Sequence, residues 1–206
     1  MIDGVKAGAG LALAFLIGSL PFSFWVAKIF RGVDIRTLGS KNAGATNVFR
    51  TQGKALGSLA LFLDAAKGAV VIWGLYPFLS SQEILDPFLF RILLGLAAIF
   101  GHIWTPFLGF KGGKGVATSA GVFLALLPGP FGVSLAVFLA VFMSTRIISV
   151  SSLAAALVFT PIVWLFYRHE SFASYAVGIS ALVALFIFYT HRANIGRLLR
   201  GEEKKL

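Results

Sequence analysis

The chain contains no cysteine and few residues that bind metals. Its 206 residues include eight Asp or Glu and three His. Without cysteine there are no disulfides, no thiolate nucleophile and no cysteine-ligated metal. The acids and histidines are scattered and do not cluster at the spacing of metal ligands, so we expect neither a metal nor another cofactor.

Charged residues are scarce as well. Only 13% of the residues are charged, whereas 58% are hydrophobic. This composition argues against a soluble domain and indicates an integral membrane protein. In a soluble protein the formal net charge of +10 would suggest nucleic acid as a partner. Here basic loops that face an anionic leaflet explain it, so we expect the lipid bilayer and no nucleic acid as partner.

Six apolar stretches are separated by short polar segments. Five of them have the length of about 20 residues that crosses one bilayer, namely 5–29, 55–79, 88–109, 149–167 and 172–190. The sixth, 116–143, forms either one long span or two short spans broken at Pro128-Gly129-Pro130. Length alone favours one span, because two helices of a dozen to sixteen residues rise only about 18–24 Å each.

The distribution of basic residues favours two spans instead. Two passes place the loop 28–54, the segment 111–114, Arg146 and the tail 191–206 on one side, with 14 of the 18 Lys and Arg residues. Because basic loops stay in the cytoplasm, we predict an all-α integral membrane protein. It is a bundle of seven transmembrane helices, two of them short, with the N-terminus outside and the C-terminus cytoplasmic. Residues 1–206 form a single membrane-embedded domain.

A glycine-lysine segment, Phe110-Lys111-Gly112-Gly113-Lys114-Gly115, lies between two apolar stretches. Glycines allow successive backbone N–H groups to form a concave nest for an anion, and lysine adds full positive charge. It is not a nucleotide P-loop, because Lys114 is followed by glycine and the flanks are apolar. A simple cytoplasmic turn that only sets topology remains the alternative.

The loop 39–54 is rich in small and hydrogen-bonding residues. Ser40, Thr46 and Asn47 offer hydroxyl and amide groups, and Arg50 offers a bidentate fork for phosphate. Thr46 or Asn47 is also expected to be the N-cap of a short interfacial helix.

Two further pairs with i,i+3 spacing stand at expected helix ends. Arg146 and Ser149 open the sixth span, and His191 and Asn194 close the seventh. Each pair is expected to lie on one helix face, from which its two side chains can contact one ligand. Taken singly, Arg146 marks the inner boundary and His191 caps terminal carbonyls. Taken together, donor-rich elements on one acid-poor face favour an anion site.

Asp64 and Lys67 lie inside the second span, also at i,i+3 spacing. Charges within a membrane are costly, and they are usually paired or functional. We expect a pair that ties the span to the bundle, with direct catalysis as the alternative. His102, near the inner end of the third span, is expected to be a structural hydrogen-bonding residue.

The ordered set of motifs resembles the bacterial acyl-phosphate-dependent glycerol-3-phosphate acyltransferases over nearly the whole chain. The motifs that carry the resemblance are Gly18-Ser19-Leu20-Pro21-Phe22, the loop 39–54, Asp64-x-x-Lys67-Gly68, Gly101-His102 followed by Pro106-Phe107 and the glycine-lysine segment, Arg146-x-x-Ser149-x-Ser151-Ser152, and His191-Arg192-x-Asn194-Ile195 to Gly201. One such motif is a weak signal, whereas the order and spacing of the set are specific.

The resemblance implies transfer of a fatty acyl group from acyl phosphate to glycerol 3-phosphate, giving 1-acyl-glycerol 3-phosphate in the first step of phospholipid synthesis. It also implies the bacterial cytoplasmic (inner) membrane, an active site facing the cytoplasm, and a soluble enzyme that supplies acyl phosphate as a further partner. By motif position we assign catalysis to Lys111, Ser149, His191 and Asn194. Substrate binding is assigned to Ser40, Thr46, Asn47, Arg50, Gly112, Gly113, Lys114 and Arg146.

The chemistry of the residues is consistent with this reaction. The His-x4-Asp motif of thioester-dependent glycerolipid acyltransferases is absent, since Phe107, Ser174 and Gly196 stand five residues after the histidines. An acyl phosphate is already activated, so positioning and charge stabilisation suffice for transfer. The base is His191 or a substrate phosphate oxygen, and no covalent acyl-enzyme is expected.

Two other functions are weighed against this one. A transporter for a small anion would suit the charges inside the second span, but its donors would lie near the midplane. A metal-dependent lipid phosphotransferase would need several acids at its site.

Overall fold

All regular secondary structure in the described residues is helical. The structure is a computed structural model that describes residues 2–79 and 86–206. The chain forms two compact units, Met1–Leu126 and Leu127–Leu206. The expected all-α class is therefore confirmed.

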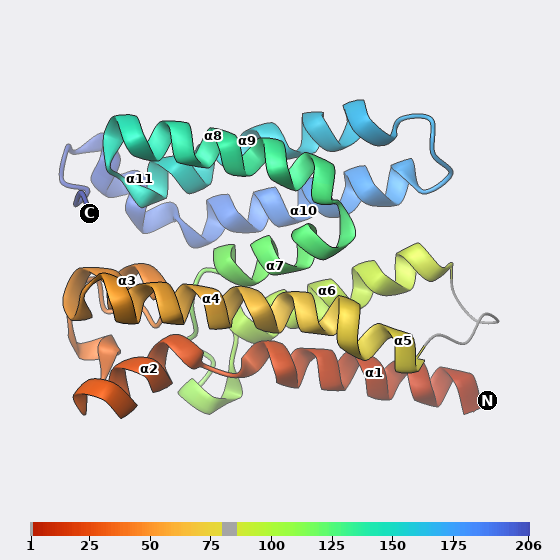
Figure 1. Ribbon diagram of the computed structural model, residues 1–206, viewed down its shortest axis with the longest axis horizontal. Helices are drawn as coiled ribbons and strands as arrows, with labels where there is room; N and C mark the ends of the chain where they lie inside the picture. Colours follow the sequence, from red (N-terminus) through yellow and green to blue (C-terminus); the bar gives the residue numbers. More distant parts are fainter. Residues whose placement is uncertain (1, 80–85) are drawn as a thin grey trace. The chain divides into compact units, whose positions relative to one another are not determined.

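The first unit contains three long apolar helical segments and several short helices between them (Figure 1). In chain order its elements are α1 (Ile2–Ser19), α2 (Phe22–Arg31), η1 (Ile35–Thr37), α3 (Ala45–Gln52), α4 (Lys54–Val70), the π-helical turn η2 (Val71–Leu75), α5 (Tyr76–Leu79), α6 (Pro87–Ile103), η3 (Pro106–Leu108) and α7 (Val116–Leu126). Helix α1 packs on α6, and α4 packs on α3 and α7.

The second unit is simpler. Its helices are α8 (Pro128–Thr145), α9 (Ile148–Tyr167), α10 (Ala173–Thr190) and the short α11 (Arg192–Leu199). Figure 1 shows α8, α9 and α10 side by side, and α9 packs against both of the others.

Six helical segments of the described chain are long and apolar enough to cross a membrane. They are Gly4–Arg31, Lys54–Leu79, Pro87–Leu108, Pro128–Thr145, Ile148–Tyr167 and Ala173–Thr190. The five full-length stretches expected from the sequence are thus present as helices.

The stretch 116–143 is broken where the prolines predicted a break. Leu127 lies between α7 and α8, and Pro128 occupies the first turn of α8, where its missing N–H costs nothing. The expectation of two short helices is wrong for α8, which has 18 residues and reaches Thr145. Only α7, with 11 residues, is short.

The first span contains a break that the sequence reading missed. Helix α1 ends at Ser19 and α2 begins at Phe22, because Pro21 has no N–H to continue the ladder. The carbonyl oxygens freed at the break accept side-chain donors from α4 and from the segment between α6 and η3. Ser19 O accepts from Thr105 Oγ1 at 2.6 Å, and Leu20 O accepts from Lys67 Nζ at 2.7 Å. Polar backbone within a span is tolerated because these bonds satisfy it.

Glycines allow the helices of the first unit to pack closely. A Cβ added at Gly101 would collide with the Phe15 carbonyl oxygen of α1, and one added at Gly121 would collide with the Ala65 carbonyl oxygen of α4. Small residues at such crossings let helix backbones approach, which favours association inside a membrane.

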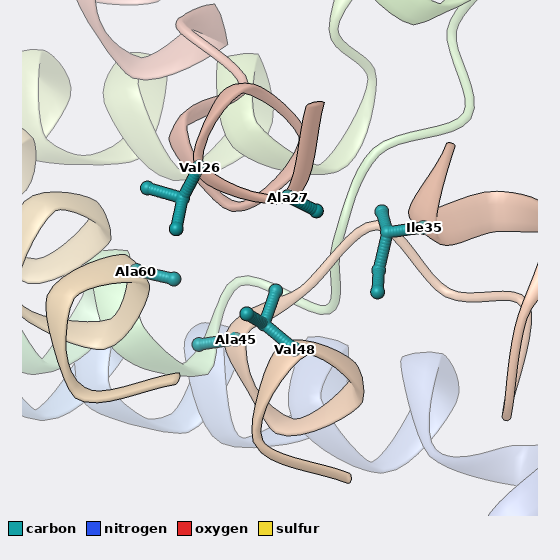
Figure 2. Packing of buried hydrophobic residues seen from close by; sticks show 6 residues of the cluster. All are labelled: Val26, Ala27, Ile35, Ala45, Val48 and Ala60. Atoms are coloured by element: carbon teal, nitrogen blue, oxygen red, sulfur yellow. The ribbon is translucent and has the colours of Figure 1, made fainter. Parts of the chain in front are cut away.

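A small apolar cluster supports the first loop. Figure 2 shows Val26 and Ala27 of α2, Ile35 of η1, Ala45 and Val48 of α3, and Ala60 of α4 packed together. Ala27, Ile35, Val48 and Ala60 are fully buried. The cluster packs α2, η1 and α3 against α4. The loop between η1 and α3 is therefore anchored at both of its ends.

Candidate active site

The first loop is organised around the Asn47 side chain. Its Oδ1 accepts from Ser40 N at 2.9 Å, and its Nδ2 donates to Ile35 O and Leu38 O, both at 2.9 Å. A further contact joins Nδ2 to Asn42 O at 3.1 Å. Since Asn47 is 1% exposed and its polar atoms bond to the loop backbone, it shapes the loop.

The expected capping role of Thr46 or Asn47 is wrong. Helix α3 begins at Ala45, and its N-cap is Gly44, which has no side chain to cap with. Thr46 and Asn47 therefore lie in the first turn, and Asn47 Oδ1 bonds the loop at Ser40 instead of an α3 N–H. Ser40 stays exposed, whereas Thr46 and Arg50 are half-buried.

The glycine-lysine segment packs directly onto the end of α6. Gly112 N donates to Ile103 O at 3.0 Å, and Gly113 N donates to His102 O at 3.2 Å. The last carbonyls of a helix lack partners within it, and these two N–H groups supply them. The expected anion nest is therefore wrong for these two N–H groups, because both point into α6.

Glycine is required in this turn for close approach. A Cβ at Gly112 would collide with the carbonyl oxygen of His102, and a Cβ at Gly113 would collide with Nε2 of the same histidine. The turn leaves Lys111 exposed and Lys114 half-buried, and α7 begins two residues later at Val116. Two lysines and a helix N-terminus thus lie within six residues of the chain, a combination that favours anions.

Asp64 and Lys67 form the pair that their spacing predicted. Lys67 Nζ lies 2.8 Å from Asp64 Oδ1, and both side chains are at most 2% exposed. The pair joins α4 to the break between α1 and α2 through Lys67 and Leu20 O.

In the second unit, Ser149 and Asn194 converge on one carboxylate that the sequence reading missed. Ser149 Oγ donates to Glu203 Oε1 at 2.9 Å, and Asn194 Nδ2 donates to the same oxygen at 2.6 Å. Arg197 Nε donates to Glu203 Oε2 at 2.7 Å. The expectation of an acid-poor face is therefore wrong at this point. The signal in the sequence was a pair of adjacent acids, Glu202 and Glu203, in an otherwise basic tail.

The environment of Glu203 keeps its side chain ionised. Burial by itself raises the pKa of this carboxyl, since its side chain is only 1% exposed. The hydrogen bonds from Asn194, Arg197 and Ser149 outweigh burial, and the pKa lies below its ordinary value. A charged Glu203 thus orders the donors around it.

The two expected i,i+3 pairs do not each lie on one helix. Arg146 is the C-cap that follows α8, whereas Ser149 lies in α9, which begins at Ile148. His191 is the C-cap that follows α10, and Asn194 belongs to α11. Left-handed backbone at Arg146, with φ of 59°, turns the chain between α8 and α9.

His191 caps α10, as one of the two expectations had it. Its Nδ1 lies 2.8 Å from Ile187 O. Because a carbonyl oxygen only accepts, Nδ1 carries the hydrogen in this contact, and in a neutral ring Nε2 then carries the lone pair.

Backbone outliers mark three of the candidate segments. Among the described residues, the non-glycine positions with positive φ are Lys41, Phe110 and Arg146. Each is next to a candidate residue or is one itself. Such conformations are disfavoured for residues with a Cβ, and they concentrate at binding and catalytic sites.

Long apolar helices and cationic loops define the chain as a multi-pass helical membrane protein. The family model for glycerol-3-phosphate acyltransferases matches residues 9–201, and the chain belongs to this family. The resemblance inferred from the motifs is thereby confirmed, and the chain is an enzyme of the family.

Curated relatives extend over nearly the whole chain. A glycerol-3-phosphate acyltransferase of Fusobacterium nucleatum is 40% identical over 195 residues, which are 95% of each chain. One of Bordetella petrii is 42% identical over 205 residues, covering 97% of this chain and 93% of the relative.

Two solved structures resemble the fold. Both are of PlsY (YgiH), described as an integral membrane glycerol 3-phosphate acyltransferase. The glycerol 3-phosphate form is 36% identical with a TM-score of 0.84, and the match covers 97% of this chain and 95% of the solved chain. The lysophosphatidic acid form has a TM-score of 0.81 at the same identity and coverage.

Proposed function

We propose that the chain transfers a fatty acyl group from acyl phosphate to the sn-1 hydroxyl of glycerol 3-phosphate. The products are 1-acyl-glycerol 3-phosphate (lysophosphatidic acid) and inorganic phosphate, in the first step of phospholipid synthesis. One observation carries the proposal: 36% identity across 97% of the chain to an acyltransferase solved in glycerol 3-phosphate and lysophosphatidic acid forms.

The reaction needs no additional activation of the acyl group. The sn-1 oxygen attacks the acyl carbon, a new carbon–oxygen bond forms, and the bond from that carbon to the phosphate oxygen breaks. The leaving group is inorganic phosphate, and its charge must be held as it departs. Fixed cationic groups do this best in a water-poor site, because they need no reorganisation during the step.

The first unit supplies most of the positive charge in this proposal. Lys111 stabilises the departing phosphate, while Lys114 and Arg50 bind phosphate oxygens. The other binding residues of this unit act through hydroxyl groups or through the shape of the loops that carry them, namely Ser40, Thr46, Asn47, Gly112 and Gly113.

The second unit supplies neutral donors and the base. Ser149 donates its hydrogen bond to Glu203, so its lone pairs can accept a hydrogen bond from the sn-1 hydroxyl of the substrate. Asn194 is fixed by the same carboxylate, and Arg146 adds a cation at the end of α8. We propose His191 as the general base through Nε2, with a substrate phosphate oxygen as the other candidate.

The arrangement in the membrane is also part of the proposal. We propose seven spans including α7, an external N-terminus and a cytoplasmic C-terminus, in a bacterial cytoplasmic membrane. The active site then faces the cytoplasm, where a soluble enzyme delivers acyl phosphate. Residues 1–206 work as one acyltransferase domain.

An assay of purified protein with three acyl donors tests the function. Acyl phosphate, acyl-CoA and acyl carrier protein are compared with and without glycerol 3-phosphate. We expect lysophosphatidic acid only from acyl phosphate, with one inorganic phosphate released per product. Equal rates from acyl-CoA would contradict the proposed donor. Phosphate release without glycerol 3-phosphate would indicate a hydrolase.

A further inference from the structure

Three buried ionisable side chains of the first unit have no part in the transfer as proposed. Asp64, Lys67 and His102 are 0%, 3% and 6% exposed. They come from α4 and α6, inside two of the membrane spans. Buried charges are costly in a membrane unless they are paired, and they tend to be functional.

The ammonium of Lys67 is surrounded by three acceptors. Leu20 O lies at 2.7 Å, Asp64 Oδ1 at 2.8 Å and His102 Nδ1 at 2.9 Å. An ammonium has three N–H groups and no lone pair. The three neighbours therefore take all three of its hydrogens.

This arrangement determines the tautomer of His102. Because Lys67 can only donate, Nδ1 of the ring accepts, and a neutral ring then carries its hydrogen on Nε2. A neutral ring fits this site, because the Asp64 carboxylate, 3.6 Å from Nδ1, is already balanced by Lys67, and a second cation beside Lys67 would be repelled.

Asp64 is itself held from two other helices. Its Oδ2 accepts from Ser23 Oγ of α2 at 2.6 Å, and its backbone oxygen accepts from Thr118 Oγ1 of α7 at 3.0 Å. The Ser23 bond thus fixes the carboxylate that orients Lys67, whereas the Thr118 bond only ties α7 to the backbone of α4.

The far edge of the His102 ring lies against the glycine turn. The ring Nε2 occupies the place that a Cβ of Gly113 would take. The backbone carbonyl oxygen of His102 accepts a hydrogen bond from the N–H of Gly113. The same carbonyl oxygen lies where a Cβ of Gly112 would be. One residue therefore contacts both glycines that precede Lys114.

We propose that His102 is a positioning residue for the glycine turn, and that Asp64 and Lys67 hold its ring in the Nε2–H tautomer. The network sets where the turn places Lys111 and Lys114, and so how tightly a phosphorylated substrate binds. The inference rests on the proposed function of the turn. It assigns the buried charges to substrate binding as well as to helix packing.

The substitution His102→Asn separates the role in substrate binding from the role in helix packing. Asparagine can present Oδ1 to Lys67 but does not reach Gly113, so the buried network keeps an acceptor while the turn loses its support. We expect a KM for at least one phosphate substrate raised on the order of tenfold, with kcat changed less. The melting temperature should stay near that of the native protein.

Thr118→Val is the matched control. It removes a buried hydrogen bond to Asp64 O without touching the His102 ring or the turn. We expect a lower melting temperature and unchanged KM values. If His102→Asn kept both KM values, or if Thr118→Val raised them equally, the positioning role would be overturned and only packing would remain.

The tautomer is tested without any activity assay. Nitrogen NMR of histidine-labelled protein in micelles should show His102 with a bare Nδ1 and a protonated Nε2, and Lys67→Met should abolish this preference. A protonated Nδ1 in the native protein would overturn the proposal. Because the spectrum needs no substrate, failure of the proposed reaction would appear separately, in the native protein's donor assay.

Discussion

Lys111 is the residue at which the loss of one charge should affect the reaction most. It is exposed at the glycine turn, next to the left-handed Phe110. Removing a charge-assisted contact to an oxyanion costs about 3 kcal/mol, or roughly a hundredfold in rate. We expect Lys111→Ala to fold normally and to lose about this factor in kcat/KM.

Lys205→Ala serves as the control for net charge, since Lys205 is exposed in the tail. It should keep the native kcat/KM. Near-native kcat/KM of folded Lys111→Ala for both substrates would mean that the segment only sets topology.

Glu203 is expected to stabilise the second unit in a pH-dependent way. Its pKa is lowered in the folded protein, so its contribution is present at neutral pH and lost as the pH falls through the folded pKa. The melting temperature of Glu203→Gln should therefore lie below the native value at pH 7. The difference should shrink as the pH falls below the ordinary glutamate value of about 4.3.

Glu202→Gln is a matched control one residue away. Glu202 pairs with Arg200 at 2.8 Å, but both side chains are more than half exposed. Exposed pairs contribute little, so we expect almost no change in melting temperature. If the two variants lost the same stability at pH 7, the buried carboxylate would have no special role.

At the scale of helices, the contact between α4 and α7 depends on Gly121. A methyl group there would collide with the Ala65 carbonyl oxygen, which belongs to a rigid helix and cannot move aside. Overpacking of this kind costs about 1–3 kcal/mol. We expect Gly121→Ala to lower the melting temperature in detergent.

Gly8→Ala in α1 is the comparison, because nothing lies within 4 Å of a Cβ added at Gly8. It should leave the melting temperature unchanged or raise it slightly, since alanine favours helix. Equal melting temperatures of the two variants would show that α4 and α7 do not need this close approach.

At the scale of the whole molecule, the decisive question is whether α7 crosses the membrane. If it does, six spans separate Thr37 from Lys205, and single cysteines at these positions label from the same side of sealed vesicles. If it does not, they label from opposite sides. The chain has no native cysteine, so each reporter is clean.

Glu170→Cys, in the turn between α9 and α10, should label from the side opposite to Lys205→Cys. Ser81, the other position suited to report the outer side, lies outside the described residues. Labelling of Thr37 and Lys205 from opposite sides would refute the seven-span arrangement.

The sequence by itself determined the class, most of the long helices and the family. Apolar length, proline positions and basic loops are local properties. The break before Pro128 therefore followed from the prolines and the basic loops, and the pairing of Asp64 with Lys67 followed from their spacing. The order of the motifs identified the family before any geometry was known.

Only the tertiary structure decided which partners the polar groups find. The N–H groups of Gly112 and Gly113 bond to α6, and the Asn47 side chain bonds to its own loop. The spacing of residues along the chain does not predict these partners, because they depend on how the loops fold back. Glu203 meets Ser149 across 54 residues, and His102 meets Lys67 across 35. Buried polar groups must form hydrogen bonds, but only the folded structure determines which neighbour each group bonds to.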